Sequence, residues 1–199
     1  MLSLTEKLPR AVEYRGRRFA LRTEYYRVLQ CFALLQQDAL PEEQVAECLR
    51  LLVKSRLRLR FLPLEDRAGL LRAVLEQYVV PQKRKKQPKS LDFTHDAGYI
   101  YSSFLLAYGI DLTESRMHWW KFLELLSGLP EETRLSQILS IRQRPMPKPT
   151  KYNGEERARL ARLKSEYAVY KTERERQQDL QEGWKHLAMT LDAMAKRSG

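Results

Sequence analysis

The sequence is poor in the residues on which most catalytic and metal sites depend. Its 199 residues include two cysteines, three histidines and eight glycines. It has no GxSxG nucleophile motif and no glycine-rich phosphate-binding loop. His95 and Asp96 form the dipeptide found in metal-dependent phosphohydrolases, but such a site needs further ligands, and the other histidines are His118 and His186. We expect no enzymatic activity, no cofactor and no bound metal.

Long apolar runs are also absent. No run reaches the roughly 18 residues that a membrane span needs, and the N-terminus lacks the basic region and apolar block of a signal peptide. We therefore expect a cytoplasmic protein without a membrane partner. Cys31 and Cys48 lie in apolar helical patterns, which under reducing conditions predicts buried thiols instead of a disulfide.

Positive charge is abundant but local. The formal net charge is +11, yet residues 48–64, 81–90 and 142–151 hold fourteen of the 36 basic residues and none of the 25 acidic ones. The rest of the chain is therefore slightly acidic. A charge block in a connecting segment indicates a solvated tether, and weak, sequence-independent phosphate binding is the alternative. For the segment 81–90 that alternative concerns Lys83, Arg84, Lys85, Lys86 and Lys89.

The N-terminal 80 residues predict a hairpin followed by helices. Residues 11–21 alternate weakly around Arg15 and Gly16, which suits a tight turn. A hairpin alone is marginal, so it must pack on helices. Helices are expected from a cap at Thr23 to about residue 37, from Pro41 through Leu52, and from residue 64 to about 78. Residues 55–61 alternate leucine and arginine, which fits a short strand or an extended helix end equally well.

Residues 92–142 predict a unit of three antiparallel helices with short connections. Asp92 is expected to cap the first helix and Gly109 to end it. Asp111 and Glu114 have capping-box spacing for the second helix, and the third follows residues 131–132. A unit of this size is marginal alone, so it should pack on residues 20–80 or on a second copy.

Two proline-containing segments divide the chain. Residues 81–90 form a basic linker, and the prolines of residues 144–150 favour an extended spacer. A helical tail is expected over residues 154 to about 196, with two apolar patches around a polar middle. We therefore predict a mainly α fold with a small β part (α+β) and these regions: 1–80 hairpin and helices, 81–90 basic linker, 91–143 three-helix unit, 144–152 proline-rich linker and 153–199 C-terminal helical arm.

Aromatic side chains are the main candidates for partner contacts. Trp119 and Trp120 cannot both point inward from one helix, because adjacent residues are about 100° apart. One should anchor the core and the other lie at a boundary or a contact surface; alternatively, a wide apolar face buries both. The arm patches either bind a partner or fold back on the core. The full set of candidates is Tyr99, Tyr101, Trp119, Trp120, Tyr167, Tyr170, Trp184 and Leu187.

The motifs DFxxDAxYIYxxF, YGIDLT, HWWKF and GLPEET, in that order, resemble a family of small bacteriophage proteins from the tail-assembly gene modules of long-tailed phages. The genes of that family lie beside the tape measure gene. The N-terminal LTEKLPRAVEYRGRRFAL is similar to the family's leading pattern, so the resemblance covers roughly residues 1–145.

The resemblance implies a tail assembly chaperone. Such a protein holds the tape measure protein in the host bacterial cytoplasm, and tail tube subunits or an upstream chaperone are its further partners. It is absent from the mature virion. Apolar helical stripes would cover the apolar seams of the tape measure protein. A structural head-tail or tail component and a nucleic-acid-binding accessory protein are the alternatives.

Overall fold

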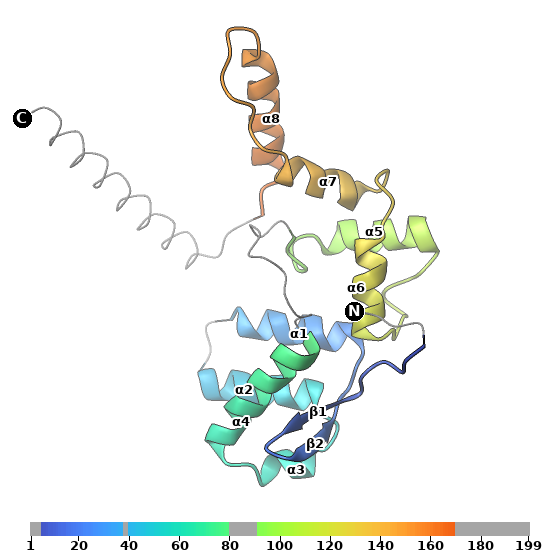
Figure 1. Cartoon of the computed structure of the whole chain (residues 1–199), viewed down its shortest axis with the longest axis vertical. Helices are drawn as coiled ribbons and strands as arrows, with labels where there is room; N and C mark the ends of the chain where they lie inside the picture. Colours follow the sequence, from blue (N-terminus) through green and yellow to red (C-terminus); the bar gives the residue numbers. More distant parts are fainter. Residues whose placement is uncertain (1–4, 38–39, 80–90, 170–199) are drawn as a thin grey trace, which may run out of the picture.

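A computed structural model describes residues 5–37, 40–79 and 91–169 of the chain. It is mainly α-helical with one small hairpin, as predicted. The hairpin and the first helices occupy one end of the molecule, and α5, α7 and α8 occupy the other, with α6 running between the two groups (Figure 1). The elements in chain order are β1 Ala11–Tyr14, β2 Arg17–Ala20, α1 Tyr25–Leu35, α2 Pro41–Leu52, α3 Arg56–Arg60, α4 Leu64–Val74, the π-helical turn η1 Leu75–Val79, α5 Ala97–Tyr108, α6 Trp119–Ser127, α7 Arg134–Gln143 and α8 Gly154–Glu166.

The hairpin forms where the sequence predicts it. Strands β1 and β2 pair antiparallel, and Val12 lies opposite Phe19 with both side chains buried. Arg15 and Gly16, the two turn residues, both have positive φ (48° and 69°), which matches the twist of the flanking strands. The Arg15 guanidinium is 2.5 Å from the Asp66 carboxylate at the start of α4, so the turn is tied to the helices beneath it.

The alternating segment at residues 55–61 is helical. The Ser55 hydroxyl accepts a hydrogen bond from the backbone N–H of Arg58 and caps α3. Residues two apart on a helix point in nearly opposite directions, so Leu59 is half-buried while Leu57 is 68% exposed. Phe61, at the end of the helix, is 78% exposed. The 48–64 basic block is therefore folded surface, and its interpretation as a tether is wrong.

Three helices begin later than the sequence predicts. The helix after Thr23 starts at Tyr25 without a side-chain cap. The Asp92 carboxylate accepts from the N–H groups of Thr94 and His95 and closes a separate turn before α5. The Asp111 carboxylate likewise accepts from the N–H and hydroxyl of Thr113. The residues of the expected capping box therefore form a separate turn, and α6 begins after it at Trp119. Gly109 ends α5 in the left-handed conformation (φ 64°), as predicted.

The C-terminal helix α8 ends at Glu166, well before the expected end near residue 196. The Tyr167 N–H donates to the Leu163 carbonyl and completes the last turn. Leu160, from the first predicted patch, is buried at 5% exposure and α8 packs on α7, so this part of the arm folds back onto the core. Tyr170, Trp184 and Leu187 lie outside the described residues, as do residues 81–90, and the division of the chain into domains stays a prediction.

One hydrophobic core spans both helical groups. It includes Phe19 and Leu52 from the N-terminal part and Phe104, Trp119 and Leu135 from the later helices. The 92–142 unit thus packs on residues 20–80 of the same chain, the first of the two expected arrangements.

Cys31 and Cys48 are buried free thiols in this core, as predicted. Within the described ranges, every helix is too short or too polar to cross a membrane.

Candidate functional site

The two tryptophans hold the helical groups together. Trp119 is 2% exposed, and its indole N–H donates to the Val79 carbonyl at 3.0 Å. Trp120 is half-buried, and its indole N–H donates to the adjacent Tyr78 carbonyl at 2.8 Å. The start of α6 is therefore hydrogen-bonded to two successive carbonyls of the π-helical turn η1. Trp119 is the core anchor and cannot be a surface contact, whereas Trp120 keeps an exposed part of its ring.

His118 fixes the start of α6. Its Nδ1 accepts the Trp120 N–H at 3.1 Å, and its Nε2 lies 3.0 Å from the Pro9 carbonyl. Only the neutral ring protonated at Nε2 satisfies both partners. Burial and the positive charges of Arg10 and Lys121 lower the pKa of His118, against the opposing effect of the Pro9 carbonyl. Protonation would put two N–H groups face to face and remove the cap.

We expect acid to weaken the fold through His118. The pKa of this residue is ordinarily 6.5 and is lowered in the folded protein, so between the two values the unfolded chain binds more protons. Stability contributed by His118 is thus present above the ordinary value and is lost as pH falls from there through the lowered pKa of the folded protein. The control is His118→Asn, which keeps a capping acceptor but does not titrate. Urea unfolding should show that the free energy of unfolding falls more steeply with decreasing pH in the wild type than in this variant. Parallel pH profiles would contradict this role.

The candidate tyrosines that the structure describes, Tyr99, Tyr101 and Tyr167, are half-buried and contact other parts of the same chain. The Tyr101 hydroxyl is 3.5 Å from the Asp111 carboxylate, and Tyr99 packs against the core. The Tyr167 hydroxyl accepts from Arg134 on α7 at 2.8 Å, with the guanidinium 5.2 Å from the ring centre. The structure does not bring these tyrosines and Trp120 together in one patch.

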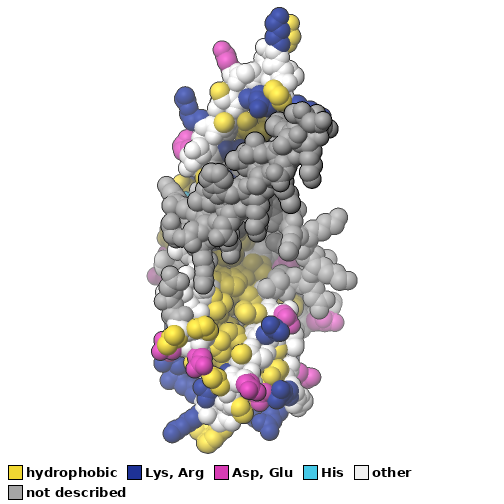
Figure 2. Space-filling view, turned by 90° about the vertical axis from the view of Figure 1, so that its left-hand side faces the viewer, with side chains coloured by type: hydrophobic (Ala, Val, Ile, Leu, Met, Phe, Trp, Pro, Cys, Tyr) yellow, Lys and Arg dark blue, Asp and Glu magenta, His cyan; other side chains and the backbone are white. Residues whose placement is uncertain are grey.

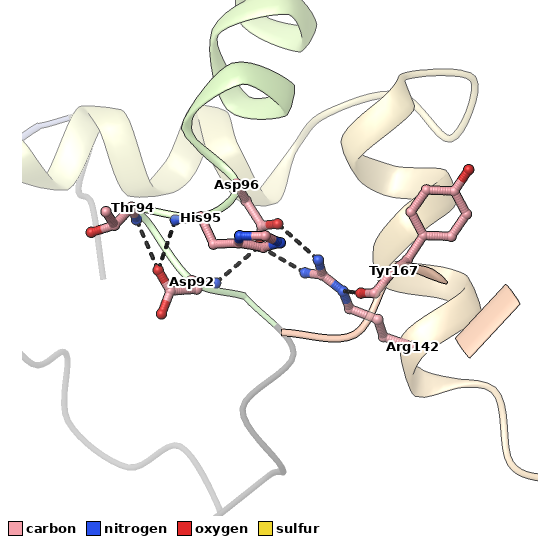
Figure 3. A network of polar contacts seen from close by, with 6 residues as sticks. All are labelled: Asp92, Thr94, His95, Asp96, Arg142 and Tyr167. Atoms are coloured by element: carbon pink, nitrogen blue, oxygen red, sulfur yellow. Dashed lines mark hydrogen bonds and ion pairs between the residues drawn. The ribbon is translucent and has the colours of Figure 1, made fainter. Parts of the chain in front are cut away.

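A buried ion pair between Asp96 and Arg142 joins separate segments of the later helices (Figure 3). The Arg142 guanidinium of α7 contacts both carboxylate oxygens of Asp96, at 2.7 and 2.8 Å, and the two side chains are 7% and 0% exposed. The Asp92 N–H donates to the same carboxylate, and the Arg142 Nε donates to the Tyr167 carbonyl. The pair therefore joins the turn before α5 to α7 and to the end of α8.

The sequence pointed to neither Asp96 nor Arg142 as members of a polar site. The His95–Asp96 dipeptide occurs in metal-dependent phosphohydrolases, but no metal was expected at it, and in the structure the Arg142 guanidinium occupies the Asp96 carboxylate. Among the described residues, no group of three or more His, Cys, Asp or Glu side chains is close enough to hold a metal ion. A buried acid at the start of an apolar helix does signal a cationic partner, but nothing in the sequence selects one cation among 36.

Large apolar side chains are exposed in both helical groups. Leu57 and Phe61 are 68% and 78% exposed beside the hairpin, and Leu105 and Leu106 are 44% and 78% exposed on α5. Figure 2 shows hydrophobic side chains at the surface of the lower part of the molecule, with Lys and Arg side chains, and Asp and Glu side chains among them, around its lower end, where Figure 1 places α3 and the hairpin. These exposed groups offer a partner apolar area to bury.

Comparison with known families gives a match over most of the chain. The model of the family described as Bacteriophage Gp15 protein matches residues 4–169. No curated protein and no solved structure matches the chain. The matched range includes the tryptophan contacts with η1, the Asp96–Arg142 pair and α8, and it extends beyond the resemblance seen in the motifs. The chain therefore belongs to the Bacteriophage Gp15 protein family.

Proposed function

We propose that this phage protein is a tail assembly chaperone that binds the tape measure protein, and the tail tube protein or an upstream chaperone, during tail morphogenesis. Membership of a bacteriophage family supports a role in the phage life cycle. The similarity of its motifs to proteins of tail-assembly modules supports this particular role. It would act in the host bacterial cytoplasm by binding, without catalysing a reaction, and would leave before the virion is complete.

The observation that carries the proposal is the pair of exposed apolar surfaces. Leu57 and Phe61 in the N-terminal group and Leu105 and Leu106 on α5 are exposed to solvent. Burying a leucine or phenylalanine side chain stabilises an assembly by about 1.5–3 kcal/mol. A long helical protein with apolar seams supplies the matching surface, by packing a helix into a groove.

Co-expression tests the chaperone role. We expect the tape measure protein of the same phage to be soluble and to co-purify with this chain, and to be insoluble when expressed with an unrelated soluble protein of similar size. Equal insolubility in both cases would show that the chain is not a tape measure chaperone.

Two observations separate the alternatives. A structural head-tail or tail component would be stoichiometric in purified virions, whereas we expect mass spectrometry to find this chain absent. A nucleic-acid-binding accessory protein would lose most DNA retention when Lys83, Arg84, Lys85, Lys86 and Lys89, all outside the described residues, are changed to glutamine. We expect the same change to leave the complex with the tape measure protein intact.

A further inference from the structure

One surface combines apolar groups with positive charge. A cavity of about 580 Å³ lies between β2 and the end of α3, lined by Arg17, Arg18, Phe19, Arg58, Phe61 and Leu62. We call these six residues the α3 surface. Phe19 and Leu62 are buried, at 2% and 8% exposure, and form an apolar floor, while Phe61 stands at the edge, 78% exposed. The volume falls within the range of ligand-binding pockets.

The positive charge of the α3 surface has no acidic counterpart in its lining. Three neighbouring cavities are also lined by Lys and Arg and by no Asp or Glu. One shares Arg18 and Arg58 with the α3 surface, one lies farther along α3, and one extends from Arg18 toward α6. The Arg58 guanidinium donates to the Arg18 carbonyl at 2.8 Å, which holds it at the rim. Among the described residues, no ion pair engages Arg17 or Arg18. Glu13 of β1 lies opposite Arg18 in the hairpin and Tyr14 lies opposite Arg17, so the charge of Arg17 in particular is available to a partner.

We infer that the α3 surface is a docking site for an acidic amphipathic helix of a partner protein. Apolar side chains of such a helix would cover Phe61 and enter the cavity, and its carboxylates would face the arginines on both sides. A single-stranded nucleic acid fits less well, because its bases stack on aromatic rings and Phe61 is the one exposed aromatic ring in this lining; duplex DNA, which binds through its phosphates, is separated by the test below. The inference rests on the proposed function in that the natural partner would be the tape measure protein.

Synthetic peptides test the site without the natural partner. One amphipathic helix carries leucines along one stripe and glutamates on its flanks, and a second carries lysines in place of the glutamates. We expect fluorescence anisotropy to show that the full chain binds the glutamate peptide at least about tenfold more tightly than the lysine peptide. Arg17→Gln with Arg18→Gln should weaken binding of the glutamate peptide by about tenfold or more. Arg159→Gln with Arg162→Gln, which removes the same charge from exposed positions on α8, should leave the affinity unchanged.

A second pair of variants tests the apolar part. Phe61→Ser should weaken binding of the glutamate peptide by about tenfold, and Tyr152→Ser, at an exposed aromatic residue (91%) just before α8, should not. Undiminished binding to Arg17→Gln/Arg18→Gln, or equal losses for Phe61→Ser and Tyr152→Ser, would overturn the inference. So would tighter binding to duplex DNA than to the glutamate peptide at physiological salt, which would identify a phosphate-binding surface.

The tape measure protein then separates failure of this site from failure of the chaperone role. A complex that forms with the wild type and is lost in Arg17→Gln/Arg18→Gln supports both. A complex that this variant retains in full keeps the chaperone role and overturns the docking site. Tight, charge-dependent peptide binding without any complex with the tape measure protein keeps the site and overturns that partner.

Discussion

Arg142→Met is expected to lower the free energy of unfolding by about 3–5 kcal/mol, because it leaves the Asp96 carboxylate buried without its cation. Asp96 is 0% exposed and Arg142 7% exposed, so solvent cannot take over the charge. The guanidinium also donates to the Tyr167 carbonyl, so the variant releases the end of α8 as well. Urea unfolding followed by circular dichroism measures the loss, and hydrogen exchange should show weaker protection in α7 and α8.

Two control variants separate the buried charge from the rest of the side chain. Asp96→Leu with Arg142→Met removes both charges and keeps much of the volume, so we expect it to be more stable than Arg142→Met alone. Arg144→Met removes an arginine of the same segment whose ion pair with Glu156 is more than half exposed, and it should cost less than about 1 kcal/mol. If Arg142→Met and Arg144→Met destabilise equally, the buried pair does not stabilise the fold.

Local sequence patterns predict which helices and strands form in this fold better than they predict the residues at which the helices begin. The turn at Arg15–Gly16, the proline at the start of α2 and the glycine after α5 each act through the backbone of their own residue, and each lies where the sequence places it. Asp92 and Asp111 also act locally, but an aspartate that caps a turn and one that caps a helix have the same sequence pattern. Each carboxylate accepts from N–H groups two or three residues on, as a helix cap would, but here the chain makes a separate turn and the helix begins after it.

Contacts between distant segments could not be predicted from the sequence. The backbone of residues 23–25 pairs with Met117 and Trp119, and the carbonyls of Tyr78 and Val79 accept from the two indoles. Both depend on how the helical groups pack, which no local pattern encodes. The α3 surface was missed for a related reason, since its arginines come from β2 and α3, about 40 residues apart in the chain, and only the fold brings them to one cavity.

The division of roles between Trp119 and Trp120 predicts the second large effect. Trp119→Ala should lower the free energy of unfolding by about 3–5 kcal/mol, because it opens a cavity in the core. The ring packs against Phe32, Phe93 and Phe122, with ring centres 5.6–6.0 Å away. Trp119→Ala also leaves the Val79 carbonyl without its indole donor. Trp120→Ala, at a half-buried ring with an equivalent hydrogen bond, should cost about 1–2 kcal/mol.

Trp119→Phe separates the two contributions at the core position. It keeps an aromatic ring but removes the N–H, so its loss should fall between those of Trp119→Ala and Trp120→Ala. Denaturant unfolding of the three variants gives the order, which would be contradicted by a larger loss for Trp120→Ala than for Trp119→Ala. Because Trp120→Ala is expected to stay folded, its affinity for the tape measure protein also tests the exposed part of that ring. Weaker binding by this folded variant would make the start of α6 a second contact surface, and unchanged binding would leave both tryptophans with a structural role only.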